Sequence, residues 1–110
     1  MTAEMVNRYI AINTDRIMDL ATLKAKERKL LFCLFQETDN FYNSTHSVYG
    51  DLIICMVLPV KKNICEKLGW KSTQTVDNGL HNLVKSNIIV RVDRGIYQLN
   101  PDLFVKVSEE

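Results

Sequence analysis

The sequence predicts a single α+β domain, and three observations support that prediction. Apolar residues recur at helical spacing in segments that begin near residues 23, 60 and 72. Two β-rich stretches, residues 88–92 and 96–99, are joined by a tight turn that contains Gly95. The chain has 110 residues, 46% of them hydrophobic, which suits one domain with a modest core.

The first elements form a short extension. Residues 8–13 alternate between polar and apolar side chains and predict a strand. Asn13 or Thr14 can then cap a helix over residues 15–23, because their side-chain oxygens accept hydrogen bonds from free backbone N–H groups. We expect that helix to turn three apolar side chains inward: Ile17, Met18 and Leu20.

The middle of the chain predicts a helix, a loop and a strand. Residues 23–38 carry an apolar stripe opposite a cluster of basic residues, which is typical of a helix with one solvated face. The polar, turn-rich stretch over residues 38–51 predicts a loop. The continuous β-branched run over residues 52–58 predicts a strand.

Two short helices follow. Pro59 suits the first turn of a helix over residues 60–68, and Gly69 suits its end. Ser72 is a good N-cap for a helix that runs to about Ser86. Its inner face is expected to consist of Val76, Leu80, Leu83 and Val84.

Gly79 interrupts this last helix beside its apolar stripe. A glycine there lowers helix propensity by about 1 kcal/mol relative to alanine. We interpret it as a point of close approach by the helix over residues 60–68.

Two helices joined by a glycine-containing turn and followed by a hairpin predict a winged helix-turn-helix. The expected architecture is a three-helix core plus a β-hairpin wing over residues 88–99. The whole chain, residues 1–110, is then one DNA-binding domain. Residues 1–22 form a strand-and-helix extension, and residues 23–106 form the winged helix.

In this motif the amino end of the second helix enters the major groove, so the helix over residues 72–86 is the predicted recognition helix. Short hydroxyl and amide side chains there can exchange hydrogen bonds with base edges or phosphates. The predicted reading residues are Ser72, Thr73, Gln74, Thr75, Asn78 and Asn82. Phosphates would be contacted by basic side chains around them: Lys61, Lys62, Lys71, Lys85, Arg91 and Arg94.

The charge distribution is compatible with a polyanionic partner. Residues 58–106 hold eight basic and four acidic residues, whereas the rest of the chain holds six basic and nine acidic ones. Cys33, Cys55 and Cys65 lie among apolar neighbours without a C-x-x-C pair, so we expect buried, reduced thiols and no bound metal or cofactor.

No enzymatic motif is recognisable, so we expect a protein that is not an enzyme. Tyr97 as a nicking nucleophile would require a metal-binding histidine pair, and His46 and His81 do not supply one. The first 15 residues lack the pattern of a secretion signal, and the apolar runs are too short to cross a bilayer, so we expect a cytoplasmic protein.

Several stretches resemble one known family. "STQTV", "LVKSNII" and above all "RGIYQLNPDLFVK" are similar to the C-terminal winged helix of RepL-type plasmid replication proteins of Firmicutes and of related initiators on mobile elements. "LATLKAKERKLLFCLF" resembles the helix that precedes the motif, and the resemblance covers residues 8–106. It implies recognition of origin or promoter DNA during initiation of replication, with residues 72–75, Asn78 and Asn82 on the reading helix and Arg91 and Arg94 on the wing.

The sequence leaves two other functions open: a winged-helix transcriptional regulator, and a winged helix that binds protein instead of DNA. The expected partner is double-stranded DNA at an origin or operator. Homodimerisation through the N-terminal strand and helix also stays open, since a two-fold protein suits a palindromic site. Contacts with host replication proteins are a further open possibility.

Overall fold

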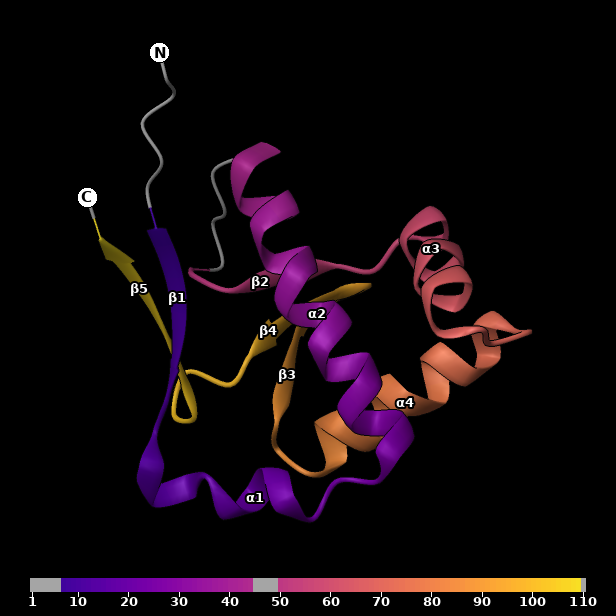
Figure 1. Cartoon of the computed structure of the whole chain (residues 1–110). Coiled ribbons are helices and arrows are strands. Elements are labelled where there is room, and N and C mark those ends of the chain that lie inside the picture. Colours follow the sequence, from indigo (N-terminus) through magenta and orange to yellow (C-terminus); the bar gives the residue numbers. More distant parts are fainter. Residues whose placement is uncertain (1–6, 45–49, 110) are drawn as a thin grey trace.

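The computed structural model describes residues 7–44 and 50–109, and shows an α+β chain with two small antiparallel sheets (Figure 1). A short 3₁₀ turn, Thr14–Arg16, follows the first strand. The helices are α1 (Met18–Ala21), α2 (Ala25–Ser44), α3 (Leu58–Leu68) and α4 (Thr73–Lys85). The strands are β1 (Asn7–Ile12), β2 (Ile53–Cys55), β3 (Ile89–Asp93), β4 (Ile96–Leu99) and β5 (Phe104–Glu109).

The long helix α2 is confirmed, but it is longer than predicted. The expected loop over residues 38–51 begins as helix and stays helical to Ser44, whereas residues 45–49 lie outside the described residues. Residues 25–44 contain no glycine or proline to stop the helix. The Thr38 hydroxyl donates to the Phe35 carbonyl at 2.7 Å, so this polar side chain is satisfied inside the helix.

The predicted strand over residues 52–58 is shorter in the structure. It is confirmed only over β2, because Leu58 already belongs to α3 and Pro59 occupies its first turn. The predicted end of α3 is confirmed: Gly69 is its C-cap, with a φ of 71° in the left-handed region that favours glycine.

The predicted start of α4 is also confirmed. Ser72 is its N-cap, and the Ser72 Oγ accepts a hydrogen bond from the Gln74 backbone N–H at 3.1 Å. Val76, Leu80 and Leu83 are buried and Val84 is partly buried, so this apolar face is the inner face of the helix.

Three strands form one sheet in the order β2-β4-β3, with both pairs antiparallel. The predicted hairpin over residues 88–99 is confirmed as β3 and β4, and Gly95 in its turn has a φ of 71°. The Met56 N–H donates to the Gly95 carbonyl at 2.8 Å, so the hairpin turn lies beside the chain that leads into α3.

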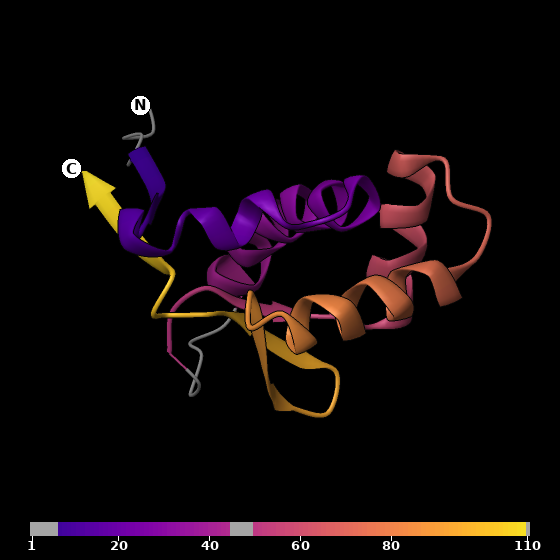
Figure 2. The same cartoon turned by 90° about the horizontal axis from the view of Figure 1, so that it is seen from below.

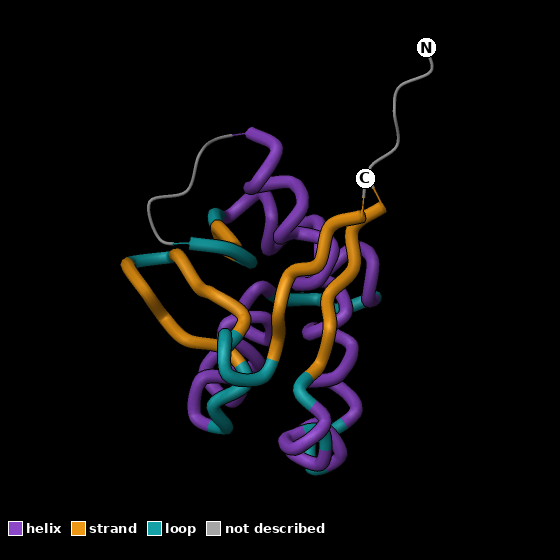
Figure 3. The backbone as a smooth tube through the Cα atoms, turned by 90° about the vertical axis from the view of Figure 1, so that its left-hand side faces the viewer, coloured by secondary structure: helices purple, strands orange, loops and turns teal. Residues whose placement is uncertain are grey.

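A second sheet pairs the two ends of the described chain. β1 is antiparallel to β5, with Ile12 opposite Phe104 and Tyr9 opposite Val107 (Figure 3). The sequence predicts no strand after residue 99, whereas β5 follows there, so the predicted boundary at residue 106 falls inside a strand. We call this two-stranded sheet the terminal ribbon.

Asn100 fixes the turn that leads into the terminal ribbon. Its Nδ2 donates to the Asn87 carbonyl at 2.7 Å, and its Oδ1 accepts from the Asp102 N–H at 3.0 Å. Its backbone N–H donates to the Ile88 carbonyl at 3.1 Å. This buried amide therefore links the end of β4 to the loop after α4.

The helix predicted over residues 15–23 is broken into the 3₁₀ turn and α1. Asn13 is the cap, because its Oδ1 accepts from the Asp15 N–H at 3.0 Å. The inward orientation predicted for Ile17 and Met18 is wrong, since these side chains are 45% and 71% exposed, although Leu20 does pack against the core. The segment is too short for one continuous face to cover the core.

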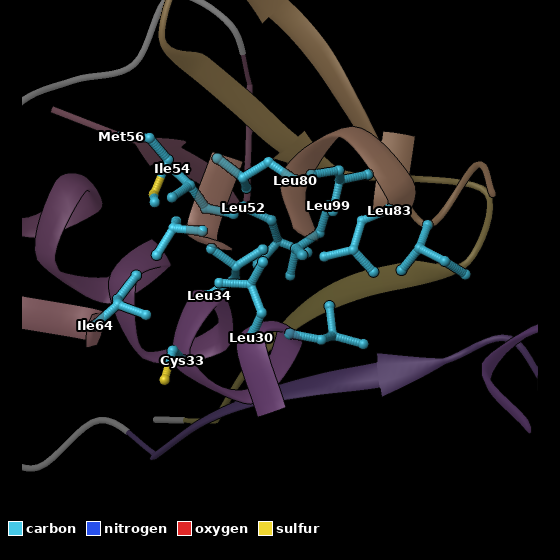
Figure 4. Packing of buried hydrophobic residues seen from close by; sticks show 14 of the residues in the cluster. Leu30, Cys33, Leu34, Leu52, Ile54, Met56, Ile64, Leu80, Leu83 and Leu99 are labelled. Carbon is cyan, nitrogen blue, oxygen red and sulfur yellow. The ribbon is translucent and has the colours of Figure 1, made fainter. Parts of the chain in front are cut away.

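The core lies between α2, α4, β2 and β4, where side chains from all four elements meet (Figure 4). Leu30, Leu34, Ile54, Leu83 and Leu99 are fully buried there. Phe35 packs edge-on against Phe104 of the terminal ribbon, with ring centroids 5.4 Å apart. The ribbon is therefore joined to the core through its inner face.

Gly79 is indeed a point of close approach, but the neighbouring helix is α2 and not the predicted α3. A Cβ built on Gly79 would lie 2.5 Å from Cδ2 of Leu30. Leu30 is fully buried, so it has little room to move away. The absence of a side chain at Gly79 sets the distance between α2 and α4.

We expect Gly79→Ala to destabilise the protein by about 1–2 kcal/mol net, because moving Leu30 out of its packed position costs about 2–3 kcal/mol. The gain of about 1 kcal/mol in helix propensity offsets only part of this cost. Urea unfolding followed by circular dichroism measures the difference. Unchanged or increased stability would show that α2 adapts to the added methyl group. His81→Ala, at an exposed position of the same helix, is the control and is expected to stay close to wild type.

Candidate nucleic-acid interface

The amino end of α4 is open to solvent. Lys71, Ser72 and Gln74 are exposed, whereas Thr73 and Thr75 are partly buried. The first turn contains no acidic residue. Free backbone N–H groups and the helix dipole make such an end favourable for a negatively charged group.

One stripe of α4 faces outward along its whole length. Gln74, Asn78, His81 and Lys85 are all exposed and recur every three or four residues, so they lie on one side of the helix. We call these four residues the outward stripe. Within it, the Gln74 Nε2 donates to the Asn78 Oδ1 at 3.0 Å.

The exposed His81 is not among the predicted reading residues. Its spacing from Asn78 and Lys85 in the sequence already placed it on the outward side.

Two of the predicted DNA contacts, Asn82 and Lys61, have side-chain partners on a different helix. The Asn82 Nδ2 donates to the Glu27 Oε2 of α2 at 3.1 Å. The other carboxylate oxygen of Glu27 accepts from the Lys24 N–H at 3.2 Å, so the same carboxylate caps α2. Asn82 thereby ties α4 to the start of α2.

Lys61 is engaged on the other side of α4. Its Nζ lies 2.7 Å from the Asp77 Oδ1, with 24% of the lysine and 41% of the aspartate side chain exposed. This ion pair joins the first turns of α3 to α4. It also neutralises Asp77, whose carboxylate would otherwise repel a phosphate near the outward stripe.

The remaining predicted cations are exposed. Lys62 lies on α3 next to Lys61, Arg91 lies on β3, and Arg94 lies in the turn between β3 and β4. Viewed from below, α4 and this hairpin occupy the same side of the molecule, opposite α1 and α2 (Figure 2). The fold thus brings α4 and the arginine-bearing hairpin to one face.

Other features of the described residues do not form a competing site. No cluster of His, Cys, Asp and Glu in residues 7–44 and 50–109 could hold a metal ion. Burial raises the pKa of the Cys33 thiol, with Lys67 opposing and Glu37 adding to the shift, so this cysteine is a poor nucleophile. Within the same residues, no helix is long and apolar enough to cross a membrane.

A hollow of about 200 Å³ lies where the chain just before β2 meets β4 and β5. It is smaller than the roughly 300–1,000 Å³ of most small-molecule sites. It is lined by Asp51, Leu52, Gln98, Leu99, Pro101, Phe104, Val105 and Lys106, none of which belongs to the outward stripe.

The fold and this surface define a small α+β protein with an amide-rich, partly basic helical face. A family model described as Firmicute plasmid replication protein (RepL) matches residues 50–110, which is more than half of the chain. The protein therefore belongs to this family, and the resemblance stated from the sequence is confirmed over those residues. The earlier segment, residues 8–49, lies outside the match. Comparisons with curated proteins and with solved structures gave no match.

We expect Asn82→Asp to destabilise the protein by about 1 kcal/mol near neutral pH, because a carboxylate replaces the donor to Glu27. The repulsion between the two carboxylates is present when both are ionised. Chemical unfolding at pH 7 measures the loss of stability. Asn78→Asp is the control, because Asn78 has no contact with Glu27 in the structure. An equal loss of stability in both variants would contradict the importance of the Asn82–Glu27 hydrogen bond.

Proposed function

We propose that the chain is a winged helix-turn-helix in which α2, α3 and α4 form the three-helix core and β3 and β4 form the wing. The support is topological. One strand, β2, separates the first two helices, the hairpin follows the third, and the sheet order is β2-β4-β3. Residues 1–110 then form one domain, with the terminal ribbon as an addition to the winged helix.

We further propose that this domain binds double-stranded DNA in a sequence-specific manner as a replication initiator of a plasmid or mobile element. The recognition helix over residues 72–86 would lie in the major groove, and the wing over residues 88–99 would lie along the backbone. The observation that carries the proposal is the exposed amino end and outward stripe of α4, a helix that lies on the same side of the molecule as the arginine-bearing hairpin. Membership in a plasmid replication family supports the same function.

The proposed contacts divide into two kinds. Ser72, Thr73, Gln74, Thr75 and Asn78 would meet base edges or the nearest phosphates, because they lie at the amino end of α4 or on its outward stripe. The exposed cations around them would meet phosphates farther along each strand: Lys62, Lys71, Lys85, Arg91 and Arg94.

Lys61 and Asn82 receive a different proposed role. In the free protein Lys61 is paired with Asp77 and Asn82 with Glu27. These contacts join α4 to α3 on one side and to α2 on the other. We propose that they set the angle at which α4 meets DNA, in place of the direct contacts predicted from the sequence.

The proposed role is binding and not catalysis. The experiment that tests it is selection of duplexes from a random pool at near-physiological salt, followed by a replication assay with the selected site on a plasmid. A selected consensus that supports replication agrees with an initiator. A consensus that only changes transcription would favour a regulator, and the absence of any duplex binding would favour a protein partner.

We expect Arg94→Ala to weaken binding to all duplexes alike and to reduce the magnitude of the salt slope by about one unit, since a phosphate contact releases about one counterion. Fluorescence anisotropy at several salt concentrations measures the slope. Lys26→Ala is the matched control, because Lys26 is an exposed cation on α2, away from the proposed interface. A salt slope identical to that of wild type would show that Arg94, in the turn between β3 and β4, does not contact phosphate.

We also propose that the protein forms a homodimer through the outer face of the terminal ribbon. Tyr9 and Val105 are 51% and 54% exposed and Val107 is 39% exposed, and the register places all three on that face. The register puts Tyr9 opposite Val107 and Ala11 opposite Val105, so these four side chains form an apolar patch. Two-stranded sheets are marginal alone, and a second copy offers the same patch in reverse, as a two-fold interface requires.

We expect Val105→Lys to convert the dimer to a monomer of 12.7 kDa, because the added charge would be buried in the interface. Light scattering coupled to size exclusion measures the mass. Val90→Lys is the control, since Val90 is also exposed but lies on β3 outside the ribbon. A wild-type protein that is monomeric at high concentration, or a Val105→Lys variant that remains dimeric, would contradict this surface.

A further inference from the structure

We propose that Gln74 reads an adenine in the major groove and that Asn78 is the positioning residue that presents it. This inference rests on the proposed DNA-binding function and specifies the ligand of its central side chain. The observation behind it is the hydrogen bond from the Gln74 Nε2 to the Asn78 Oδ1, 3.0 Å long, on the outward stripe of α4.

This hydrogen bond uses only part of the Gln74 amide. The side chain has two N–H donors and one carbonyl oxygen. With one N–H bonded to Asn78, the other N–H and the Oε1 of this exposed side chain remain available as a donor and an acceptor. Residues 74 and 78 are one helical turn apart, so the bond forms without distortion of the helix.

The remaining donor and acceptor match one base. Adenine presents the N7 acceptor beside the N6 amino donor in the major groove, and a glutamine amide can meet both at once. Guanine presents two acceptors, N7 and O6, at the same positions. The Oε1 of Gln74 would face the guanine O6 without a proton between them, so guanine would be disfavoured.

Asn78 restricts how the Gln74 amide can face. While the Asn78 Oδ1 is the acceptor, Gln74 must turn an N–H toward it, and the reverse orientation would require the Asn78 amide to turn as well so that its Nδ2 donates to the Gln74 Oε1. Asn78 therefore orders a long, otherwise free side chain before DNA arrives, which reduces the entropy lost on binding. The first turn of α4, held by the Ser72 cap, places Gln74 nearest the groove.

The test uses the full chain and the duplex consensus obtained by random selection. Each position of the consensus is changed in turn, and the affinities of wild type, Gln74→Ala, Asn78→Ala and Asn78→Asp are measured by fluorescence anisotropy. Wild type should prefer adenine at one position by about 5- to 150-fold, and Gln74→Ala should lose that preference while it retains the others.

The Asn78 variants separate positioning from direct contact. Asn78→Ala should reduce the adenine preference. Asn78→Asp should retain it, because a carboxylate still accepts from the Gln74 N–H, although its charge should weaken binding to every duplex alike. Gln36→Ala is the matched control, since it removes an exposed amide from α2, outside the proposed interface.

The outcomes distinguish this inference from the proposed function. If Gln74→Ala binds duplex with every base preference intact, Gln74 reads no base and the inference is wrong, while DNA binding stands. A guanine preference that depends on Gln74 would also overturn it. If wild type selects no duplex at all, the proposed function itself fails.

Discussion

The packing of α4 against α2 is the constraint on which the rest of the structure depends. Gly79 lets α4 lie so close to α2 that a single methyl group would meet Leu30 at 2.5 Å. Val76, Leu80 and Leu83 then enter the core, and Gln74, Asn78, His81 and Lys85 necessarily face out. Helical geometry allows no other arrangement once the inner side is fixed. The chemistry of the exposed side is thus a consequence of the packing on the buried side.

Two polar contacts further restrict the orientation of α4, in addition to its apolar packing. The pairs Asn82–Glu27 and Lys61–Asp77 approach α4 from two different helices, so together they limit rotation of α4 about its own axis. Each is partly exposed and contributes little free energy alone. Their main effect is to fix the orientation of α4. If a recognition helix rotated about its axis, it would present a different set of amide side chains to a groove. The same residues that appear in the sequence as candidate contacts can therefore act by fixing their neighbours.

The terminal ribbon connects distant parts of the chain to this arrangement. Its inner face contacts the core where Phe104 packs against Phe35. Asn100 links the turn that leads into the ribbon to the loop after α4. On the outer face, Tyr9, Val105 and Val107 are exposed. In Figure 1 the ribbon lies on the opposite side of the molecule from α3 and α4. A protein partner on the ribbon and a DNA duplex on α4 would therefore not compete for the same surface.

Local patterns in the sequence by themselves determined the paired helices, their caps at Ser72 and Gly69, and the β3–β4 hairpin. In these elements the strongest signals come from residues within one turn of each other. They also placed hydroxyl and amide side chains at the amino end of α4. Only the tertiary structure decided that α2 continues to Ser44, that residues 104–109 form a strand with residues 7–12, and that Asn82 and Lys61 are engaged within the chain. The physical reason is that β5, like any strand, takes its backbone hydrogen bonds from a partner, and this partner lies about a hundred residues away, beyond the reach of any local pattern.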